Sequence, residues 1–331
     1  MGKQAFYIDF SADNSVRMAM AEPGRRPPPS QLYHCYSLAE LDDAIGGYLA
    51  ENGNPELIGA GLSVCGWERN GAFEMPNHSY SIERDWIRGR LDISRVHLIN
   101  DCVASALAIE RLEDSERLTI HAGHDDPTQM KAMIALGRAL GTTCIVTDEL
   151  GNTMCVPCAG GHCDLAATTD REYAVVRLMA QKFGHVSSVR AVSTAGLAEI
   201  FNNLNIIDGR DGKAATGADV VALARATDAR AVEALAMAVG WLAATASDTA
   251  LSVGARGGVF LAGSYFDVLG DMFDAELFRA RFCAKGRLRG YLEDIAVYLV
   301  KGARARNGRP EHPCSDRLFR QDAPQSVRIS L

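Results

Sequence analysis

The sequence predicts an α/β protein built from two domains. A chain of 331 residues is longer than one hydrophobic core usually serves, so two domains are expected. Short apolar runs alternate with stretches of helical periodicity, and each half begins with strands near a hairpin and ends with helix-flanked strands. This order indicates a duplicated α/β pattern, although the two halves share no repeated sequence. We place the smaller domain at residues 1–112 and the larger one at residues 113–301.

The first domain is expected to begin with three strands. Residues 6–10 are an apolar run typical of a buried strand, and the runs at 16–21 and 31–35 are its expected antiparallel neighbours. Ser37 and Glu40 have the spacing of a capping box, which predicts a helix to about residue 49. The remaining elements are expected as strands at 57–65 and 94–99, an extended segment at 73–76, a helix capped by Ser81 that runs to about residue 90, and a helix at 102–112.

The second domain has the two most regular helical patterns. Residues 229–253 form a long, mostly apolar stretch with many small residues on one face. Residues 170–183 are amphipathic, and the side expected to be buried carries Tyr173, Val176, Leu178, Met179 and Phe183. The other elements are expected as strands at 117–121, 131–136, 257–263 and 294–300, a hairpin of 142–147 with 153–156, and helices at 194–204 and 218–226. Residues 302–331 form a polar tail, a candidate to pack on the smaller domain.

Asn100 and Asp101 stand where the strand at 94–99 passes into the helix at 102–112. Open α/β sheets place ligand groups at such corners, outside the carboxyl ends of strands. A carboxylate there can accept the proton of a substrate hydroxyl as its oxygen attacks a phosphoryl group. The alternative is structural, because aspartate is also a preferred helix N-cap.

Composition limits the partners and the compartment. The net charge is −7, from 34 basic and 41 acidic residues with no basic stripe, which argues against a nucleic-acid partner. The longest apolar stretch, 234–246, is too short to cross a bilayer, and the N-terminus has no secretory pattern, so we expect no membrane partner and a cytoplasmic protein. Nine cysteines scattered through apolar segments fit reduced thiols.

One segment of the chain contains a cluster of potential metal ligands. Cys155 and Cys158 have a spacing common in zinc sites, and His162 and Cys163 follow. Adjacent residues point to opposite sides of a strand, however, so His162 and Cys163 would not both face one ion. Buried thiols are the simpler interpretation, and we assign no metal to the site residues.

Four sequence blocks point to a family. They are residues 96–106, which contain the Asn100-Asp101 pair, 160–166, with Gly160-Gly161-His162, 254–263, which end in Gly263, and 282–287. In these blocks and their order the chain resembles bacterial glucokinases, which belong to the sugar kinase and actin-like ATPase superfamily. The resemblance implies a two-domain, actin-like (RNase H-like) sugar kinase fold, with sugar and ATP in an interdomain cleft. Family members are often dimers, so the resemblance also allows a homodimer.

The resemblance implies roles for individual residues. Asp101 would be the base that activates the 6-hydroxyl of glucose or a related hexose. The other substrate-binding residues would be Asn100, Gly161, His162 and Asn77. ATP and Mg²⁺ are the implied cofactors, with Asp9 near the ion and the phosphates and Gly263 beside the adenosine. The other residues implied to bind the nucleotide would be Asn14, Gly137, Arg138, Gly141 and Ser264.

The chain departs from the family pattern at residues that would bind phosphate and sugar, rather than at residues that form the scaffold. In the first phosphate loop, Ser11 and Ala12 replace glycines, and Asp13 replaces a threonine with a negative charge. Ala159 stands where the family has a sugar-binding glutamate, and Val189 replaces a second one. Two hypotheses follow: an active hexose kinase, or a catalytically impaired pseudokinase that binds sugar or regulates another process on the same fold.

Overall fold

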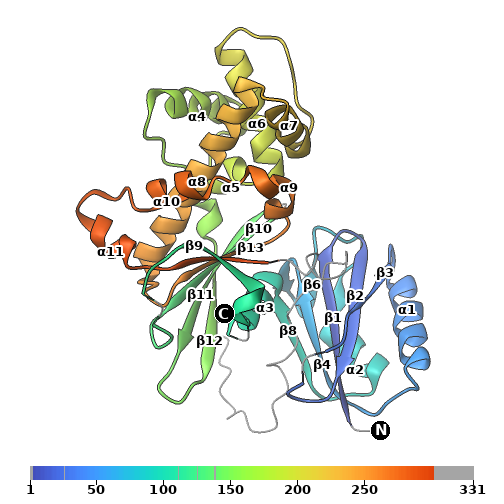
Figure 1. Ribbon diagram of the computed structural model, residues 1–331. Helices are drawn as coiled ribbons and strands as arrows, with labels where there is room; N and C mark the ends of the chain where they lie inside the picture. The colour runs from blue at the N-terminus through green and yellow to red at the C-terminus, as the bar shows by residue number, and fades with distance from the viewer. Residues whose placement is uncertain (1–2, 26, 111, 125, 138, 302–331) are drawn as a thin grey trace. The chain divides into compact units, whose positions relative to one another are not determined.

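The computed structural model describes residues 3–301 except 26, 111, 125 and 138, and within this range the chain forms two compact α/β units that divide near residue 111 (Figure 1). The predicted tail at 302–331 lies outside the described residues. In the first unit, coloured blue to teal, a five-stranded sheet has the order β3-β2-β1-β4-β8. Its strands are β1 (Gln4–Ala12), β2 (Ser15–Ala21), β3 (Gln31–His34), β4 (Leu57–Val64) and β8 (Val96–Asn100).

Three helices and a small second sheet complete the first unit. The helices are α1 (Leu38–Glu51), α2 (Arg84–Leu91) and α3 (Asp101–Ile109), and the small sheet holds β5 (Trp67–Arg69), β6 (Ala72–Glu74) and β7 (Ile82–Glu83). Ser37 caps α1 as predicted, accepting the backbone N–H of Glu40. The predicted cap of α2 at Ser81 is wrong, because Ile82 pairs with Phe73 and keeps the chain extended through residue 83.

The core of the first unit follows from strand alternation. Phe6, Ile8 and Phe10 of β1 are fully buried and pack in one cluster with side chains of α1 and α2. Successive side chains of a strand point to opposite faces, so Tyr7 and Asp9 belong to the other face of the sheet. β1 therefore directs Phe6, Ile8 and Phe10 into the apolar cluster and Asp9 away from it. Helix α3 packs against β1, β4 and β8.

The second unit repeats the arrangement of the first. Its sheet has the order β12-β11-β10-β13-β14-β9, in which β12, β11 and β10 are antiparallel and β10, β13 and β14 are parallel. The first sheet likewise joins an antiparallel trio to two further parallel strands. This confirms the predicted duplication. The strands are β9 (Arg117–His121), β10 (Lys131–Leu136), β11 (Leu140–Thr147), β12 (Thr153–Cys158), β13 (Val259–Ala262) and β14 (Val297–Val300).

A helical layer surrounds the long helix α8 (Ala229–Val253) in this unit (Figure 1). By length and composition α8 could cross a membrane, but 72% of its apolar window is buried inside the unit, which identifies it as the central core helix. The fully buried Trp241 anchors it, with its indole N–H donating to the carbonyl of Ala166 at 3.1 Å. The other helices are α4 (Asp170–Phe183), α5 (Ser188–Ala191), α6 (Thr194–Ile207), α7 (Gly217–Arg225), α9 (Tyr265–Leu269), α10 (Ala275–Phe282) and α11 (Arg289–Glu293).

The buried side of α4 agrees with the predicted one at Met179, and Val176 and Phe183 pack against the core, but it differs at two other positions. Its buried residues are Glu172, Val175 and Met179, whereas Tyr173 is 56% exposed. Burial of Glu172 is possible because its carboxylate has polar partners. It accepts hydrogen bonds from the backbone N–H and the hydroxyl of Thr168, and it forms an ion pair with Arg281 of α10. Hydrophobic periodicity cannot anticipate a charged residue that faces inward toward a partner more than a hundred positions away.

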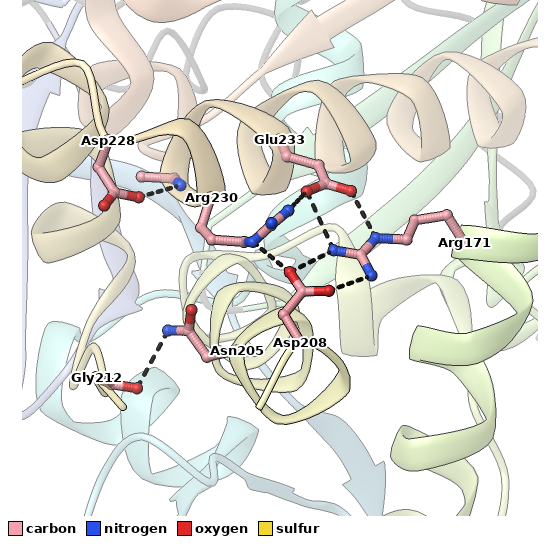
Figure 2. Close-up of polar contacts among 8 residues, drawn as sticks. Arg171, Asn205, Asp208, Gly212, Asp228, Arg230 and Glu233 are labelled. Carbon is pink, nitrogen blue, oxygen red and sulfur yellow. Dashed lines mark hydrogen bonds and ion pairs between the residues drawn. The ribbon is translucent and has the colours of Figure 1, made fainter. Parts of the chain in front are cut away.

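An ion-pair network joins three helices of this unit (Figure 2). The guanidinium of Arg171 (α4) donates to both oxygens of Asp208, at 2.8 and 2.9 Å, and to Glu233 (α8) at 2.7 Å. Arg230 pairs with the same two carboxylates. These side chains are only 19–30% exposed. Hydrogen bonds and charge from Arg171 hold the pKa values of Asp208 and Glu233 below their usual range.

The network predicts a pH-dependent contribution to stability. A carboxylate with a depressed pKa in the folded state stabilises the fold above its unfolded pKa, about 4, and loses that contribution as the pH falls through the folded value. Replacing Arg171→Met should therefore lower the urea midpoint of unfolding at pH 7. The difference in urea midpoint between the variant and the original protein should become smaller as the pH falls from about 4 to about 2. The control is Lys182→Met on the same helix, which removes an exposed pair with Glu199 and should cost about 0–1 kcal/mol. A gap independent of pH would contradict the electrostatic origin.

Candidate active site

Asp101 lies at the corner between β8 and α3, where the sequence predicts it. Asn100 is the N-cap, and its side-chain oxygen accepts the backbone N–H of Cys102 at 2.9 Å. Asp101 Oδ1 accepts the same N–H, also at 2.9 Å. Asn100 therefore caps α3, and Asp101, which is half-buried, shares the capped N–H through Oδ1.

Asp9 and Cys65 belong to the same edge of the sheet as Asp101. β1 and β4 run parallel with Asp9 opposite Ser63, and β4 and β8 run parallel with Ser63 opposite Ile99. Cys65 directly follows the last residue of β4. Because parallel strands end at a common edge, three neighbouring strands bring two carboxylates and a thiol together.

The charge of the Asp101 carboxylate acts on two thiols. Burial, then the charge of Asp101, a hydrogen bond with it and the charge of Asp9 raise the pKa of Cys65 from 9.0 to about 11. Burial and then the charge and hydrogen bond of Asp101 also raise the pKa of Cys102 far above its usual range. Both groups are therefore neutral thiols at neutral pH. Only its place directly after a buried strand distinguishes Cys65 in the sequence.

Asn14 and Asn77 lie together at the turn between β1 and β2. Asn14 adopts a left-handed conformation with φ of 41°, which asparagine tolerates better than most residues. Its backbone N–H donates to the carbonyl of Asn77 at 3.0 Å, and the Asn77 side-chain amide donates to the carbonyl of Phe10 at 2.7 Å. Both residues thus help to hold this turn, whatever they bind in addition.

Residues 137–141, which the family resemblance implies as a second phosphate loop, lie at a tight hairpin between β10 and β11. Leu136 pairs with Leu140, and the N–H of Gly137 donates to the carbonyl of Ala139 at 3.0 Å. Arg138 lies outside the described residues. Gly141 is a residue of β11 itself, opposite Ala135 of β10, rather than part of the turn.

Gly263 and Ser264, which follow β13, lie beside this hairpin. A Cβ on Gly263 would stand 1.9 Å from the carbonyl oxygen of Leu136, and its φ of +113° strains any other residue. A Cβ on Gly137 would stand 3.2 Å from the Ser264 hydroxyl. The structure therefore brings together Gly137, Gly263 and Ser264, three of the residues predicted to face the nucleotide.

Gly161 and His162 lie in a 3₁₀ turn, Gly160–His162, that packs on β11. A Cβ on the buried Gly161 would stand 2.2 Å from the carbonyl oxygen of Leu140, and the N–H of Gly160 donates to Thr142 Oγ1 at 3.0 Å. These contacts fix the turn on the strand and leave His162 exposed. Within the described ranges, no group of three or more His, Cys, Asp or Glu side chains is arranged to hold a metal ion, the cysteines around this turn included.

Comparison with known proteins identifies the family. The Glucokinase family model matches residues 14–306. A glucokinase from Chromobacterium violaceum is 34% identical over 264 residues, which cover 80% of this chain and 76% of that protein.

Solved structures share the fold. A crystal structure of a glucokinase from an Antarctic psychrotroph has a TM-score of 0.81 at 23% identity, covering 92% of this chain and 96% of the other. A glucokinase from Balamuthia mandrillaris in complex with glucose has a TM-score of 0.75 at 15% identity, covering 94% and 91%. Both the fold predicted from the sequence, that of a two-domain sugar kinase, and the family resemblance are confirmed, and the chain belongs to the glucokinase family.

Proposed function

We propose that the protein transfers the γ-phosphoryl group of ATP to the 6-hydroxyl of glucose or a related hexose, with Asp101 as general base. Membership of the glucokinase family supports a sugar kinase activity. The observation that supports the assignment of the base is the position of Asp101. It is a half-buried carboxylate at the carboxyl end of a parallel strand, next to Asn100, the N-cap of α3.

In the proposed reaction the sugar 6-oxygen forms a bond to the γ-phosphorus while the bond from that phosphorus to the β,γ-bridging oxygen breaks. The electron pair of the broken bond leaves with ADP, and the hydroxyl proton passes to the Asp101 carboxylate. The carboxylic acid then returns its proton to water, and the products are the sugar 6-phosphate and ADP.

The remaining predicted residues would hold the two substrates. Asn100, Asn77 and the Gly161-His162 turn are proposed to contact the sugar, and the exposed imidazole of His162 is able to hydrogen-bond hydroxyls. The Gly137 hairpin and the turn at Gly263 and Ser264 are proposed to contact the nucleotide, since they lie side by side in the second unit.

Asp9 is proposed to face the magnesium ion that accompanies ATP. Its carboxylate is an oxygen donor of the kind Mg²⁺ prefers, and Mg²⁺ sites commonly use only one or two protein carboxylates beside the substrate phosphates. When bound, the ion supplies positive charge that neutralises the phosphate oxygens. The register of β1 with β4 and of β4 with β8 favours this role, because it assigns Asp9 to the edge that also carries Asp101.

A second candidate is a pseudokinase that binds sugar or regulates another process. It is favoured by the exposed Asp13, a negative charge at the turn between β1 and β2 where the family pattern places a phosphate loop. Ala159, which precedes the Gly160–His162 turn, adds to it because an alanine cannot accept a hydrogen bond from a sugar hydroxyl.

Replacing Asp101→Asn tests the general base. The amide keeps the size of the side chain and an oxygen for the Cys102 N–H, so the fold should persist by circular dichroism. Loss of the base should lower kcat about 10²- to 10⁴-fold in an assay that couples ADP formation to NADH oxidation. The matched control is Asp43→Asn, an exposed aspartate of α1, which should leave kcat unchanged. Equal turnover in the two variants would remove Asp101 from this role.

Ligand-dependent melting separates the two candidates. For the kinase, glucose and MgATP should each raise the melting temperature, because a ligand that binds only the folded state stabilises it by about 2.7 kcal/mol at a concentration of 100 Kd. The same samples should form glucose 6-phosphate. A shift with a hexose but not with MgATP, together with no sugar phosphate, would favour the pseudokinase and contradict the proposed reaction.

A further inference from the structure

The turn that carries His162 is held by a hydroxyl group from a neighbouring strand. Thr142 of β11 is 2% exposed. Its Oγ1 accepts the backbone N–H of Gly160 at 3.0 Å and donates to the carbonyl oxygen of Cys158 at 3.1 Å. A hydroxyl can donate its hydrogen and accept another bond at the same time, so the two contacts are compatible. One side chain of β11 therefore connects the end of β12 with the start of the 3₁₀ turn.

The N-cap residue of this turn cannot accept its first N–H. The first backbone N–H groups of a helical turn have no partner inside the turn, and an oxygen of the N-cap side chain commonly accepts one of them. Here the N-cap is Ala159, whose side chain has no such oxygen. Thr142 supplies the acceptor from another strand instead. Because Gly160 lies only two residues before His162, this bond helps to set the direction of the imidazole.

The imidazole of His162 depends on the turn for its direction. Gly161 packs closely against the backbone of Leu140, and the N–H of Ser188 donates to the carbonyl of Cys163 at 3.0 Å. Within the described part of the chain, the exposed imidazole itself makes no hydrogen bond. Its orientation is therefore set through the backbone, and the Thr142 hydroxyl holds the beginning of that backbone segment.

We propose that Thr142 is a positioning residue, whose hydroxyl holds the Gly160–His162 turn in the conformation from which His162 binds a hexose hydroxyl. This inference rests on the proposed function, in which that turn contacts the sugar. Thr142 does not touch the substrate in this scheme.

The next residue of β11 provides a matched control. Thr143 is 1% exposed, and its hydroxyl has no hydrogen-bond partner among the described residues. Valine has nearly the shape of threonine but no hydroxyl. Comparing valine at the two positions therefore separates the loss of the bridging hydroxyl from the loss of a buried hydroxyl in general.

The kinetic test removes the hydroxyl while keeping the branched shape of the side chain. Thr142→Val should raise the KM for glucose about two- to twelvefold, the value of one hydrogen bond in affinity, and change the KM for ATP less than twofold. Binding that is lost equally from substrate and transition state leaves kcat nearly unchanged. Thr142→Ser restores the hydroxyl and should recover most of the lost affinity. Thr143→Val should leave kcat and both KM values unchanged.

Two results of the kinetic test would overturn the proposal. One is a KM for glucose that is unchanged in Thr142→Val or does not recover in Thr142→Ser. The other is an equal rise in the KM values for glucose and ATP, which would indicate a general loss of structure. If the valine variant does not fold by circular dichroism, Thr142→Ala replaces it in the same comparison, since alanine leaves space where the hydroxyl was.

Amide hydrogen exchange tests the contact without any enzyme activity. In Thr142→Val the Gly160 N–H loses its acceptor, so a peptide covering residues 159–163 should take up deuterium about three- to tenfold faster than in the original protein. Thr142→Ser and Thr143→Val should exchange at the original rate, and a peptide from α4 should be unchanged in every variant. Equal rates at the turn in Thr142→Val and the original protein would overturn the proposed contact.

The two tests separate this inference from the proposed function. If the original protein phosphorylates a hexose and Thr142→Val leaves the KM for that sugar unchanged, the proposed function holds and the positioning role is wrong. If the original protein neither binds nor phosphorylates a hexose, the proposed function fails, and the role of Thr142 in sugar binding fails with it.

Discussion

The parallel pairing of β1, β4 and β8 is the constraint on which the candidate site depends. Because these strands are neighbours and end at one edge, residues separated by more than ninety positions in the chain share a small space. Hydrogen bonds of the sheet ladder fix the register, and a slip of one residue would turn Asp9 from the α3 face of the sheet into the apolar cluster beneath α1. The buried Phe6, Ile8 and Phe10 oppose such a slip, since each would have to leave the core.

The sequence predicts the scaffold well because the scaffold depends on local patterns. The bounds of α4 and α8 agree with their periodicity, and the corner at Asn100 and Asp101 lies where the strand and helix patterns meet. The predictions are wrong where a residue distant in the chain determines the local conformation or the direction of a side chain. The chain stays extended at Ile82 because it pairs with Phe73, and Glu172 turns inward because Arg281 neutralises it.

The residues that surround Asp101 could not be predicted from local sequence patterns. Cys65 follows a strand in the sequence like many other residues, and its place beside Asp101 at the edge of the sheet follows from the pairing of β4 with β8. Asn77 posed a related problem. It was expected near a sugar, and the structure gives it a definite task in the turn between β1 and β2, where its amide supports the carbonyl of Phe10. A motif can thus identify an important residue while leaving its physical task undetermined.

The close approach of backbone at Gly161 and Gly263 has a consequence for how relatives of this chain can diverge. Each glycine faces a carbonyl oxygen of the β10–β11 hairpin at a separation that admits no side chain. Descendants that keep this hairpin must keep both glycines, even after every trace of phosphoryl transfer has been lost. Their survival records the architecture alone. Drift of function will be visible instead at positions such as His162 and Asp101, where the backbone imposes no such demand.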